Sequence, residues 1–441
     1  MSECSVSPLD LFQNPPVQTA VLSSYHEQIR PVASVSDFAP IEFIVPSSGE
    51  SYLDLSSTMI KITAKILGPD GTGIARDIMG APVNNFLHSM FSKTTVSLNG
   101  RSISDTTHTY PYKSYLETLL NFSTDTKNGE LSASLWQPDT PGKFNNHVIS
   151  GGGKNEGFEN RKRLGGGGRL ISMMGRVFDS ALNQQKYLID GVDLRITFFR
   201  SKDTFCINRA MPADPSTNPP IPFTVQIESA VLYVRRINLS NPCQKAINAA
   251  LKISPAKYDF VRTDMRMYSI PTGVSEWSQT NLVLGQIPRR MIIFFVKTEA
   301  FHGNYGDNPF NMENLDIGFM QLRRDGRSLP LDPLVPNFNY EGKDYVRTYM
   351  HFQNGLNKSL RNDDIGLSYD DFGEGNTFFI FKLSGEDSVE SCSEPDQRGS
   401  VDITTRFRTA TQYPVTAFCY REFDSTISIT KDREIELDYI V

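Results

Sequence analysis

The sequence predicts an all-β protein built from two similar domains, and three observations support this. Apolar residues recur at every second position in many short runs along the 441 residues, which is the period of a half-buried strand. Helical periodicity is confined to two short segments. Short motifs also recur in the same order after about half the chain length, which indicates a duplicated domain.

Alternating runs predict the individual strands. In the clearest run Ile60, Ile62, Ala64 and Ile66 alternate with polar residues. The same period appears at 192–198, 223–227, 401–408 and 435–439. Turn-forming residues separate such runs, at Gly68-Pro69-Asp70-Gly71, Asn99-Gly100 and Asp325-Gly326. Many short antiparallel strands joined by turns build sandwiches or barrels.

Two segments predict helices. Tyr112, Tyr115, Leu116 and Leu119 fall at helical spacing just after Pro111, and proline is favoured in the first helical turn. A second helix is predicted at about 243–252, with Ser240 as its cap. This second helix lies near the middle of the chain, where it would join the two domains.

The internal repeat rests on three pairs at nearly one offset. Pro46 and Pro271 are separated by 271 − 46 = 225 residues, Phe86 and Phe310 by 310 − 86 = 224, and Gly100 and Gly326 by 326 − 100 = 226. We therefore expect the members of each pair to occupy equivalent positions in two domains. The expected organisation is an extended arm at 1–36, a first domain at 37–239, a linker helix at 240–254 and a second domain at 255–441.

The N-terminal segment 1–36 is predicted to be extended. Pro8, Pro15, Pro16 and Pro31 remove backbone donors and disfavour helix. Two interpretations stay open: a solvated tail, or an arm whose apolar residues dock on its own body or on a neighbour.

Composition excludes several classes of protein. Lys+Arg 44 against Asp+Glu 50 gives a net charge of −6, so specific nucleic-acid binding is not expected. The five cysteines include no Cys-x-x-Cys pair, which argues against a disulfide framework and suits a reducing compartment. The N-terminus shows no signal-peptide pattern. The longest apolar run, Met291–Val296, is far shorter than the roughly 20 residues of a transmembrane segment.

No stretch carries a recognisable reaction site. Gly151-Gly152-Gly153-Lys154 lacks the glycine and the hydroxyl residue that a phosphate-binding loop needs. The glycine-rich stretch 151–168 is instead predicted to be a long flexible loop. Its basic cluster, Arg161-Lys162-Arg163, is predicted to be solvated, with a nucleic acid or an acidic neighbour as the alternative. The six histidines form no His-x-His or His-Glu-x-x-His pattern, and there is no Gly-x-Ser-x-Gly. We expect no catalytic, cofactor-binding or metal-binding residues, and no cofactor.

A series of sequence blocks resembles the major capsid proteins of Polinton/Maverick elements and their adintovirus relatives. The resemblance covers roughly residues 9–350. In chain order its blocks are LDLF at 9–12, PPVQT at 15–19, APIEF at 39–43, YLDL at 52–55, PVNNFLH at 82–88, SLNG at 97–100, YPYKSYLETLL at 110–120, MMGR at 173–176, LIDGVD at 188–193, RSKD at 200–203, SIPTG at 269–273, LGQ at 284–286 and NPF at 308–310. The glycine-rich stretch 151–168 departs from the family pattern.

The resemblance implies a double jelly-roll fold, with two eight-stranded antiparallel sandwiches in one chain and few short helices. It implies a homotrimeric, pseudo-hexagonal capsomer that tiles an icosahedral shell. Partners would be further copies of the chain, a single jelly-roll penton protein and minor capsid proteins. The chain would be made and assembled inside the host cell and reside in the virion. The alternative function is a jelly-roll carbohydrate-binding module; a jelly-roll metalloenzyme is disfavoured by the missing His-x-His.

Overall fold

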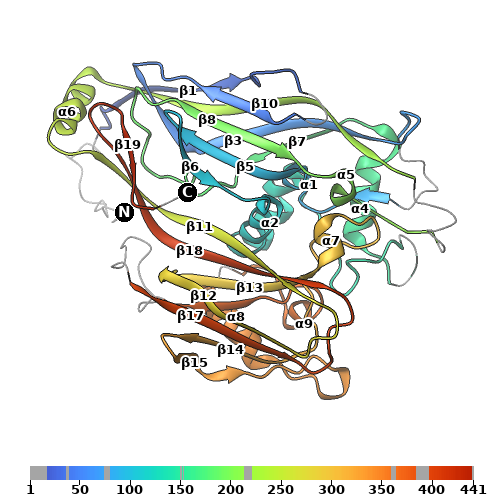
Figure 1. Ribbon diagram of the computed structural model, residues 1–441. Helices are drawn as coiled ribbons and strands as arrows, with labels where there is room; N and C mark the ends of the chain where they lie inside the picture. The colour runs from blue at the N-terminus through green and yellow to red at the C-terminus, as the bar shows by residue number, and fades with distance from the viewer. Residues whose placement is uncertain are drawn as a thin grey trace, which may run out of the picture.

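The computed structural model describes residues 17–35, 39–73, 80–148, 151, 153–212, 221–358, 364–383 and 397–439. Within them the chain forms two β-sandwiches, one above the other in Figure 1, and a separate two-stranded ribbon. The ribbon pairs β4 (Gly80–Pro82) with β9 (Ile207–Arg209).

The first sandwich has two four-stranded sheets. One has the order β1-β10-β3-β7 and the other the order β2-β8-β5-β6, and all the pairs are antiparallel. Their bounds are β1 (Val21–Ile29), β2 (Ile41–Val45), β3 (Ser51–Leu67), β5 (Phe91–Leu98), β6 (Arg101–Asp105), β7 (Ile171–Arg176), β8 (Leu194–Arg200) and β10 (Thr224–Leu239).

The second sandwich repeats this plan. Its sheets have the orders β11-β18-β13-β16 and β12-β17-β14-β15, and β19 (Ile435–Leu437) adds a further pairing with β18. The bounds are β11 (Ala256–Ile270), β12 (Glu276–Gln286), β13 (Arg290–Lys297), β14 (Ile317–Arg324), β15 (Arg327–Leu334), β16 (Phe379–Lys382), β17 (Arg398–Phe407) and β18 (Val415–Ile429).

The two sandwiches have the same strand topology. When the eight main strands of each are numbered in chain order, both give a 1-8-3-6 sheet facing a 2-7-4-5 sheet. Eight antiparallel strands wound into two sheets in this way form a jelly roll. The chain is therefore a double jelly-roll, and the predicted all-β class and the duplication are confirmed.

Two of the three repeat pairs mark equivalent positions. Gly100 and Gly326 both close the turn between the fourth and fifth strands, with positive φ angles of 77° and 79°. Phe86 and Phe310 both lie between the third and fourth strands. The third pair is wrong, because Pro46 follows the second strand of its sandwich and Pro271 follows the first.

The mismatch arises at β1, which we expected to lie outside the first domain. Residues 21–29 pair with β10 and form the first strand of the first sandwich, so a boundary at residue 37 is too late. Most β1 side chains are exposed, because it is an edge strand, and the sequence therefore shows no alternation there. Of the expected arm, residues 1–16 lie outside the described residues.

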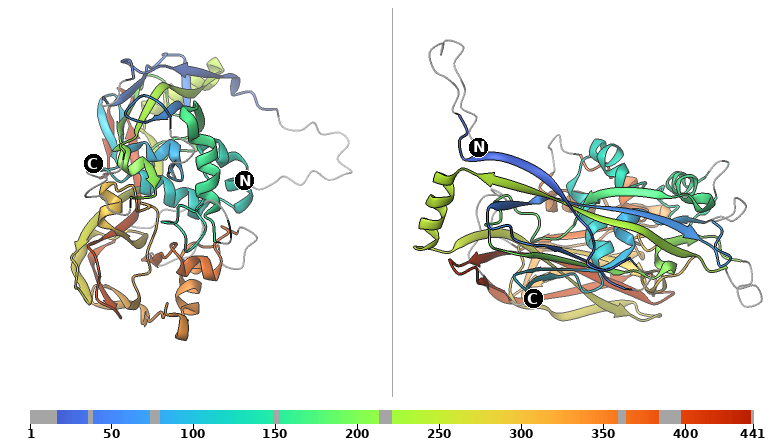
Figure 2. Two further views of the ribbon diagram at one scale, coloured as in Figure 1. Left: turned by 90° about the vertical axis from the view of Figure 1, so that its right-hand side faces the viewer. Right: turned by 90° about the horizontal axis from the view of Figure 1, so that it is seen from above.

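The two predicted helices are present as α2 (Tyr110–Asn121) and α6 (Asn241–Leu251), although the Ser240 side chain makes no capping hydrogen bond. Most other helices are short, and several lie in the long connections between the fifth and sixth strands. These connections lie on the same side of the molecule in both views of Figure 2. The remaining helices are α1 (Phe86–Ser89), α3 (Thr124–Asn128), η1 (Glu130–Ser134), α4 (Glu156–Gly165), η2 (Gly166–Gly168), α5 (Asp203–Cys206), α7 (Thr298–His302), η3 (Tyr340–Gly342), α8 (Val346–Gly355) and α9 (Tyr369–Gly373).

The prediction of a flexible loop at 151–168 is wrong, because residues 156–165 form helix α4. The Asn155 side chain caps it by accepting from the Phe158 amide at 3.4 Å. Glu156 and Glu159 lie in the first turn and basic residues in the last, which suits the helix dipole. Glycines outnumber good helix formers here, so propensity alone did not reveal the helix.

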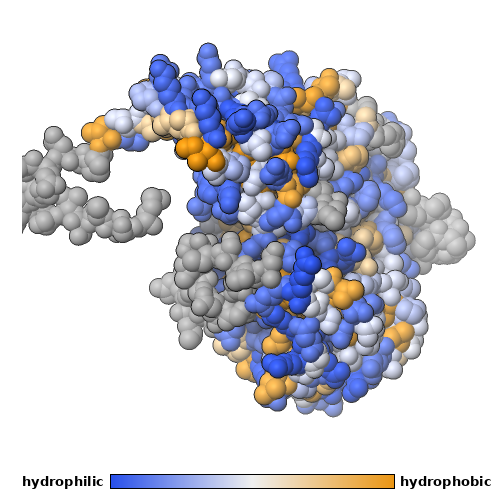
Figure 3. Space-filling model, turned by 60° about the vertical axis from the view of Figure 1, so that its left-hand side comes forward, coloured by the Kyte–Doolittle hydropathy of each residue, from blue (hydrophilic) through white to orange (hydrophobic). Residues whose placement is uncertain are grey.

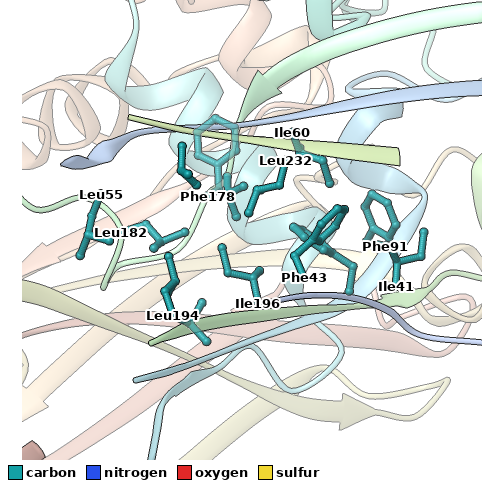
Figure 4. Close-up of a cluster of buried hydrophobic side chains, with 14 of the residues drawn as sticks. Ile41, Phe43, Leu55, Ile60, Phe91, Phe178, Leu182, Leu194, Ile196 and Leu232 are labelled. Atoms are coloured by element: carbon teal, nitrogen blue, oxygen red, sulfur yellow. The ribbon is translucent and has the colours of Figure 1, made fainter. Parts of the chain in front are cut away.

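Each sandwich encloses an apolar core between its two sheets. Figure 4 shows the first core, where Phe43, Phe91 and Ile196 of one sheet meet Ile60 and Leu232 of the other. The second core gathers residues such as Ile293, Phe295 and Leu322. A third cluster lies at the contact between the two sandwiches.

Candidate functional site at the joint of the two sandwiches

Helix α2 is the centre of the joint. It belongs to the long fifth-to-sixth connection of the first sandwich, and its predicted apolar face packs on the second. The Tyr112 ring lies 4.6 Å from that of Phe418, and the Tyr115 ring stacks on Phe310 at 4.3 Å. All four rings are buried. Ring contacts of this kind add to the free energy gained by burying the rings themselves.

Strand β13 is buried on both faces as a result. Ile292, Phe294 and Val296 face the joint, whereas Met291, Ile293 and Phe295 face the core of the second sandwich. This explains the longest apolar run of the sequence, since a strand without a wet face has no polar positions to alternate. An unbroken apolar run such as Met291–Val296 therefore indicates a strand buried on both faces, which a search for alternation alone does not detect.

A buried ion pair lies beside the joint, within the long connection of the first sandwich. Arg161 of α4 donates from Nη2 to Asp139 at 2.6 Å, with both side chains 1% exposed or less. Arg161 also donates to the carbonyls of Pro82 and Gln137. The other oxygen of Asp139 accepts from Asn308 of the second sandwich at 2.8 Å. The cluster Arg161-Lys162-Arg163 was predicted to be solvated, which is wrong for Arg161.

A second polar seam runs along the same contact. Arg433 donates to Asp190 at 3.0 Å and to its carbonyl at 2.7 Å. The Tyr420 hydroxyl donates to Glu117 of α2 at 3.2 Å. Burial raises the pKa of Glu117, partly offset by Lys113. Polar pairs at such a contact fix its register, because each group is costly to bury without its partner.

One histidine and two cysteines are buried inside the fold. His88 is buried with Nδ1 3.0 Å from the Tyr110 hydroxyl, and burial lowers its pKa to about 3. Cys206 and Cys419 are buried thiols, and burial raises the pKa of Cys419 to about 12. Within the described residues, no group of three or more His, Cys, Asp or Glu side chains is placed to hold a metal ion.

The segment from β15 to α8 carries several exposed apolar side chains. Leu331 is 85% exposed and Tyr340 is 96% exposed, and Val335, Val346 and Met350 are also exposed. We call these five residues the β15–α8 patch. Arg347 ties the helix to the strand by donating to the carbonyls of Asp332 and Pro333 at 3.0 Å. Such side chains, clustered in sequence, suit contact with another molecule. Apolar areas are visible on both sandwiches in Figure 3.

A polar hollow of about 570 Å³ lies where the first sandwich's loop 142–145 meets the second sandwich. Its walls include Glu313, Glu374, Asn314 and Tyr413, and the Tyr413 hydroxyl donates to Glu313 at 2.5 Å. Burial raises the pKa of Glu313. The hollow offers acid, amide and aromatic groups to a polar ligand.

Among the described residues there is no helix with the length and apolarity needed to cross a membrane.

Comparison with known proteins gives one full-length sequence relative and a set of structural ones. The uncharacterized protein F54H12.2 of Caenorhabditis elegans is 24% identical, and the match covers 97% of this chain and all of that protein. No protein-family model matches the chain.

The structural relatives are viral. A chain of the Sputnik virophage is similar with a TM-score of 0.63 and 13% identity, covering 98% of this chain and 91% of that one. The PBCV-1 virus capsid gives 0.59 at 8% identity, covering 98% and 100%. The mavirus major capsid protein gives 0.53 at 12% identity, covering 99% and 94%. At these identities the likeness shows that the double jelly-roll fold is shared from end to end.

Proposed function

We propose that this chain is a viral major capsid protein. The observation that carries the proposal is the duplicated jelly roll, with one strand order in both sandwiches, found along the whole chain. Structural relatives that include virus capsid proteins share this architecture over nearly their full length. A reaction site is not needed for this role, since the work is done by contacts between copies.

The architecture explains how one chain builds a shell. Two jelly rolls per chain give six in a homotrimer, which approximates sixfold symmetry and lets one block tile a closed lattice. Such a block must be stiff, and the joint supplies stiffness through the rings around Tyr112 and the hydrogen bond from Asn308 to the buried Asp139. The helix-bearing connections on one side of the molecule are suited to form the outer face.

The finer assignment is to the Polinton/Maverick and adintovirus-like group. The sequence blocks between residues 9 and 310 support it. We infer that the chain resides in the virion, assembled inside the host cell without secretion, and is not an enzyme. Its partners are its own copies, a single jelly-roll penton protein and minor capsid proteins.

The β15–α8 patch is our candidate for contact between copies. Obligate interfaces bury roughly 2,000 Å² or more and are apolar, which matches exposed Leu331 and Tyr340. With a net charge of −6, the chain should bind DNA only weakly and non-specifically.

The decisive experiment is to purify the full chain and measure its mass and shape by light scattering and negative-stain microscopy. We expect a trimer near three times 49.5 kDa, or a larger shell. The paired variant Leu331→Ser with Tyr340→Ser should lose assembly while keeping the wild-type circular dichroism spectrum. A chain that stays monomeric at micromolar concentration, across salt conditions, contradicts the proposal.

The polar hollow favours one second candidate, the carbohydrate-binding module. Glu313, Asn314 and Tyr413 are residue types that bind sugar hydroxyls. A glycan array on the same preparation separates the two functions. Saturable sugar binding by a monomer, lost in Glu313→Gln, would favour the module.

A further inference from the structure

The chain continues beyond the eighth strand of the second sandwich. That strand, β18, ends at Ile429, and the chain then turns into the short strand β19, which pairs back on the end of β18. We call residues 430–439 the C-terminal extension. In the first sandwich the eighth strand, β10, leads directly to helix α6 instead. The extension is therefore an addition to the repeated plan, and in Figure 1 it lies, in red, at the level of the first sandwich.

Arg433 anchors the extension to the first sandwich from both ends of the residue. Its guanidinium pairs with Asp190 and also donates to the Asp190 carbonyl at 2.7 Å. Its own carbonyl accepts from the side chain of Asn99 at 3.0 Å. Gly191 leaves room for this contact, since a Cβ there would lie 2.9 Å from Nε of Arg433. The first sandwich is thus shaped to receive this arginine.

The extension also lies against the edge strand β6 of the first sandwich, the last strand in its sheet. The pairing of β5 with β6 skips Ile103, whose carbonyl instead accepts from the Tyr439 hydroxyl at 3.0 Å. Arg101 of the same strand donates to the carbonyl of Ile435 at 2.9 Å. An open strand edge presents unpaired backbone groups to other chains. The extension therefore covers part of such an edge.

The apolar side of the extension completes the core of the first sandwich. Ile435 is buried, and it belongs with Ile427 and Ile429 of β18 to the same cluster as Leu188 and Val192 of the first sandwich. Removing the extension would open this cluster to water, although the eight strands of each jelly roll would remain. The extension thus serves the contact between the sandwiches rather than the strand order of either one.

The contact joins segments that are made at very different times. Asn99 and Arg433 are 334 positions apart in the chain. Chains are made from the N-terminus, and domains generally fold as units in that order. The first sandwich therefore receives its last contacts only after nearly the whole chain has been made.

We propose that the C-terminal extension is a latch that fixes the two sandwiches to one another only in a complete chain, and that assembly of copies depends on this latch. The second part rests on the proposed capsid function, because a block must be stiff before it can tile a shell. A truncated or still-growing chain lacks the latch. Its two sandwiches are loosely coupled, its β6 edge is open, and it stays out of shells.

The test is hydrogen–deuterium exchange of the full chain, read by mass spectrometry. The double variant Arg433→Met with Tyr439→Phe removes the side-chain anchors and keeps the backbone of the extension. We expect amide exchange at 101–105 and 188–191 to rise at least about tenfold, since each hydrogen bond lost shifts a local opening equilibrium severalfold. Exchange at 401–407, in strand β17 of the second sandwich, should keep the wild-type rate.

Two single variants complete the comparison. Lys431→Met also removes one positive charge, but from an exposed position of the extension, and should match the wild type. Tyr439→Phe alone removes one hydroxyl and should raise exchange about threefold at 101–105, which keeps the test decisive if the double variant fails to fold. Unchanged exchange in Tyr439→Phe, or a rise of equal size across both sandwiches, overturns the latch.

Assembly of the same preparations is then measured by light scattering at equal concentration. We expect the double variant to give at least about tenfold fewer shells than the wild type and Lys431→Met to assemble normally. Normal assembly of a chain whose exchange shows an open latch overturns the role of the latch in assembly. If the wild type itself does not assemble, the capsid function fails, whereas the exchange comparison still decides whether the extension latches the sandwiches.

Discussion

Replacing Arg161 with methionine should destabilise the chain strongly. The change leaves the Asp139 carboxylate buried with only the amides of Asn155 and Asn308 as partners. Breaking a buried ion pair from one side costs about 3–5 kcal/mol. Two further acceptors, the carbonyls of Pro82 and Gln137, lose their donor, at about 1–3 kcal/mol for each group left unsatisfied. We therefore expect a loss at the upper end of the ion-pair range.

Urea unfolding followed by tryptophan fluorescence is a suitable assay, because Trp136 lies at the joint and Trp277 lies in the second sandwich. The matched control is Arg163→Met, an exposed neighbour on α4, which should change stability by less than about 0.5 kcal/mol. Adding Asp139→Leu to Arg161→Met should recover much of the loss, since replacing both partners is often neutral. If Arg161→Met and Arg163→Met cost the same, the assignment of a buried ion pair is refuted.

Three further predictions follow from the structure. Stability should fall as pH drops from about 6.5 toward 3, by about 2 kcal/mol at pH 5, because the unfolded state binds a proton at His88 that the fold excludes. The urea midpoint of His88→Gln should therefore fall less over this pH range than that of the wild type. Gly326→Ala should lower the free energy of unfolding by about 1 kcal/mol, because its φ of 79° lies in the left-handed region. Gly166→Ala, at φ −74° with open space around it, should leave the free energy of unfolding unchanged in the same urea assay. Deleting residues 1–30 should lower the melting temperature below that of a chain lacking only 1–16 and should cause aggregation, because the longer deletion removes β1 and exposes the edge of β10. Equal melting of the two truncations would show that β1 adds nothing to stability.

Strands with one wet face and one dry face could be predicted from the sequence. The alternation at Ile60, Ile62 and Ala64 appears in the structure as β3, and the Asn99-Gly100 turn closes a hairpin. Helix α2 was predicted from the same kind of pattern. In each case the local period reports directly which side chains are buried, so no knowledge of distant contacts is needed.

Elements whose burial depends on distant parts of the chain could not be predicted in this way. Strand β1 is mostly exposed and is defined by its pairing with β10, some 200 residues away. Helix α4 is held by Arg161, whose partner Asp139 lies in another segment. The joint was missed for the same reason, since the apolar face of α2 does not reveal which sheet it covers.

The repeat itself shows how the joint relates to the duplication. Asn84 and Phe86 of the first sandwich correspond to Asn308 and Phe310 of the second. Asn84 accepts from the Gln137 amide at 2.7 Å, while Asn308 donates to Asp139 at 2.8 Å and to the Phe144 carbonyl at 3.2 Å.

Both asparagines therefore hold the segment 137–144, one from each sandwich. That segment belongs to the long connection of the first sandwich, and the described part of the second sandwich has no counterpart of the same form. A motif present in both repeats thus secures an element described in only one. Loss of either asparagine should loosen the same segment, and this shared dependence makes the two sandwiches one mechanical unit, as the proposed capsid function would require.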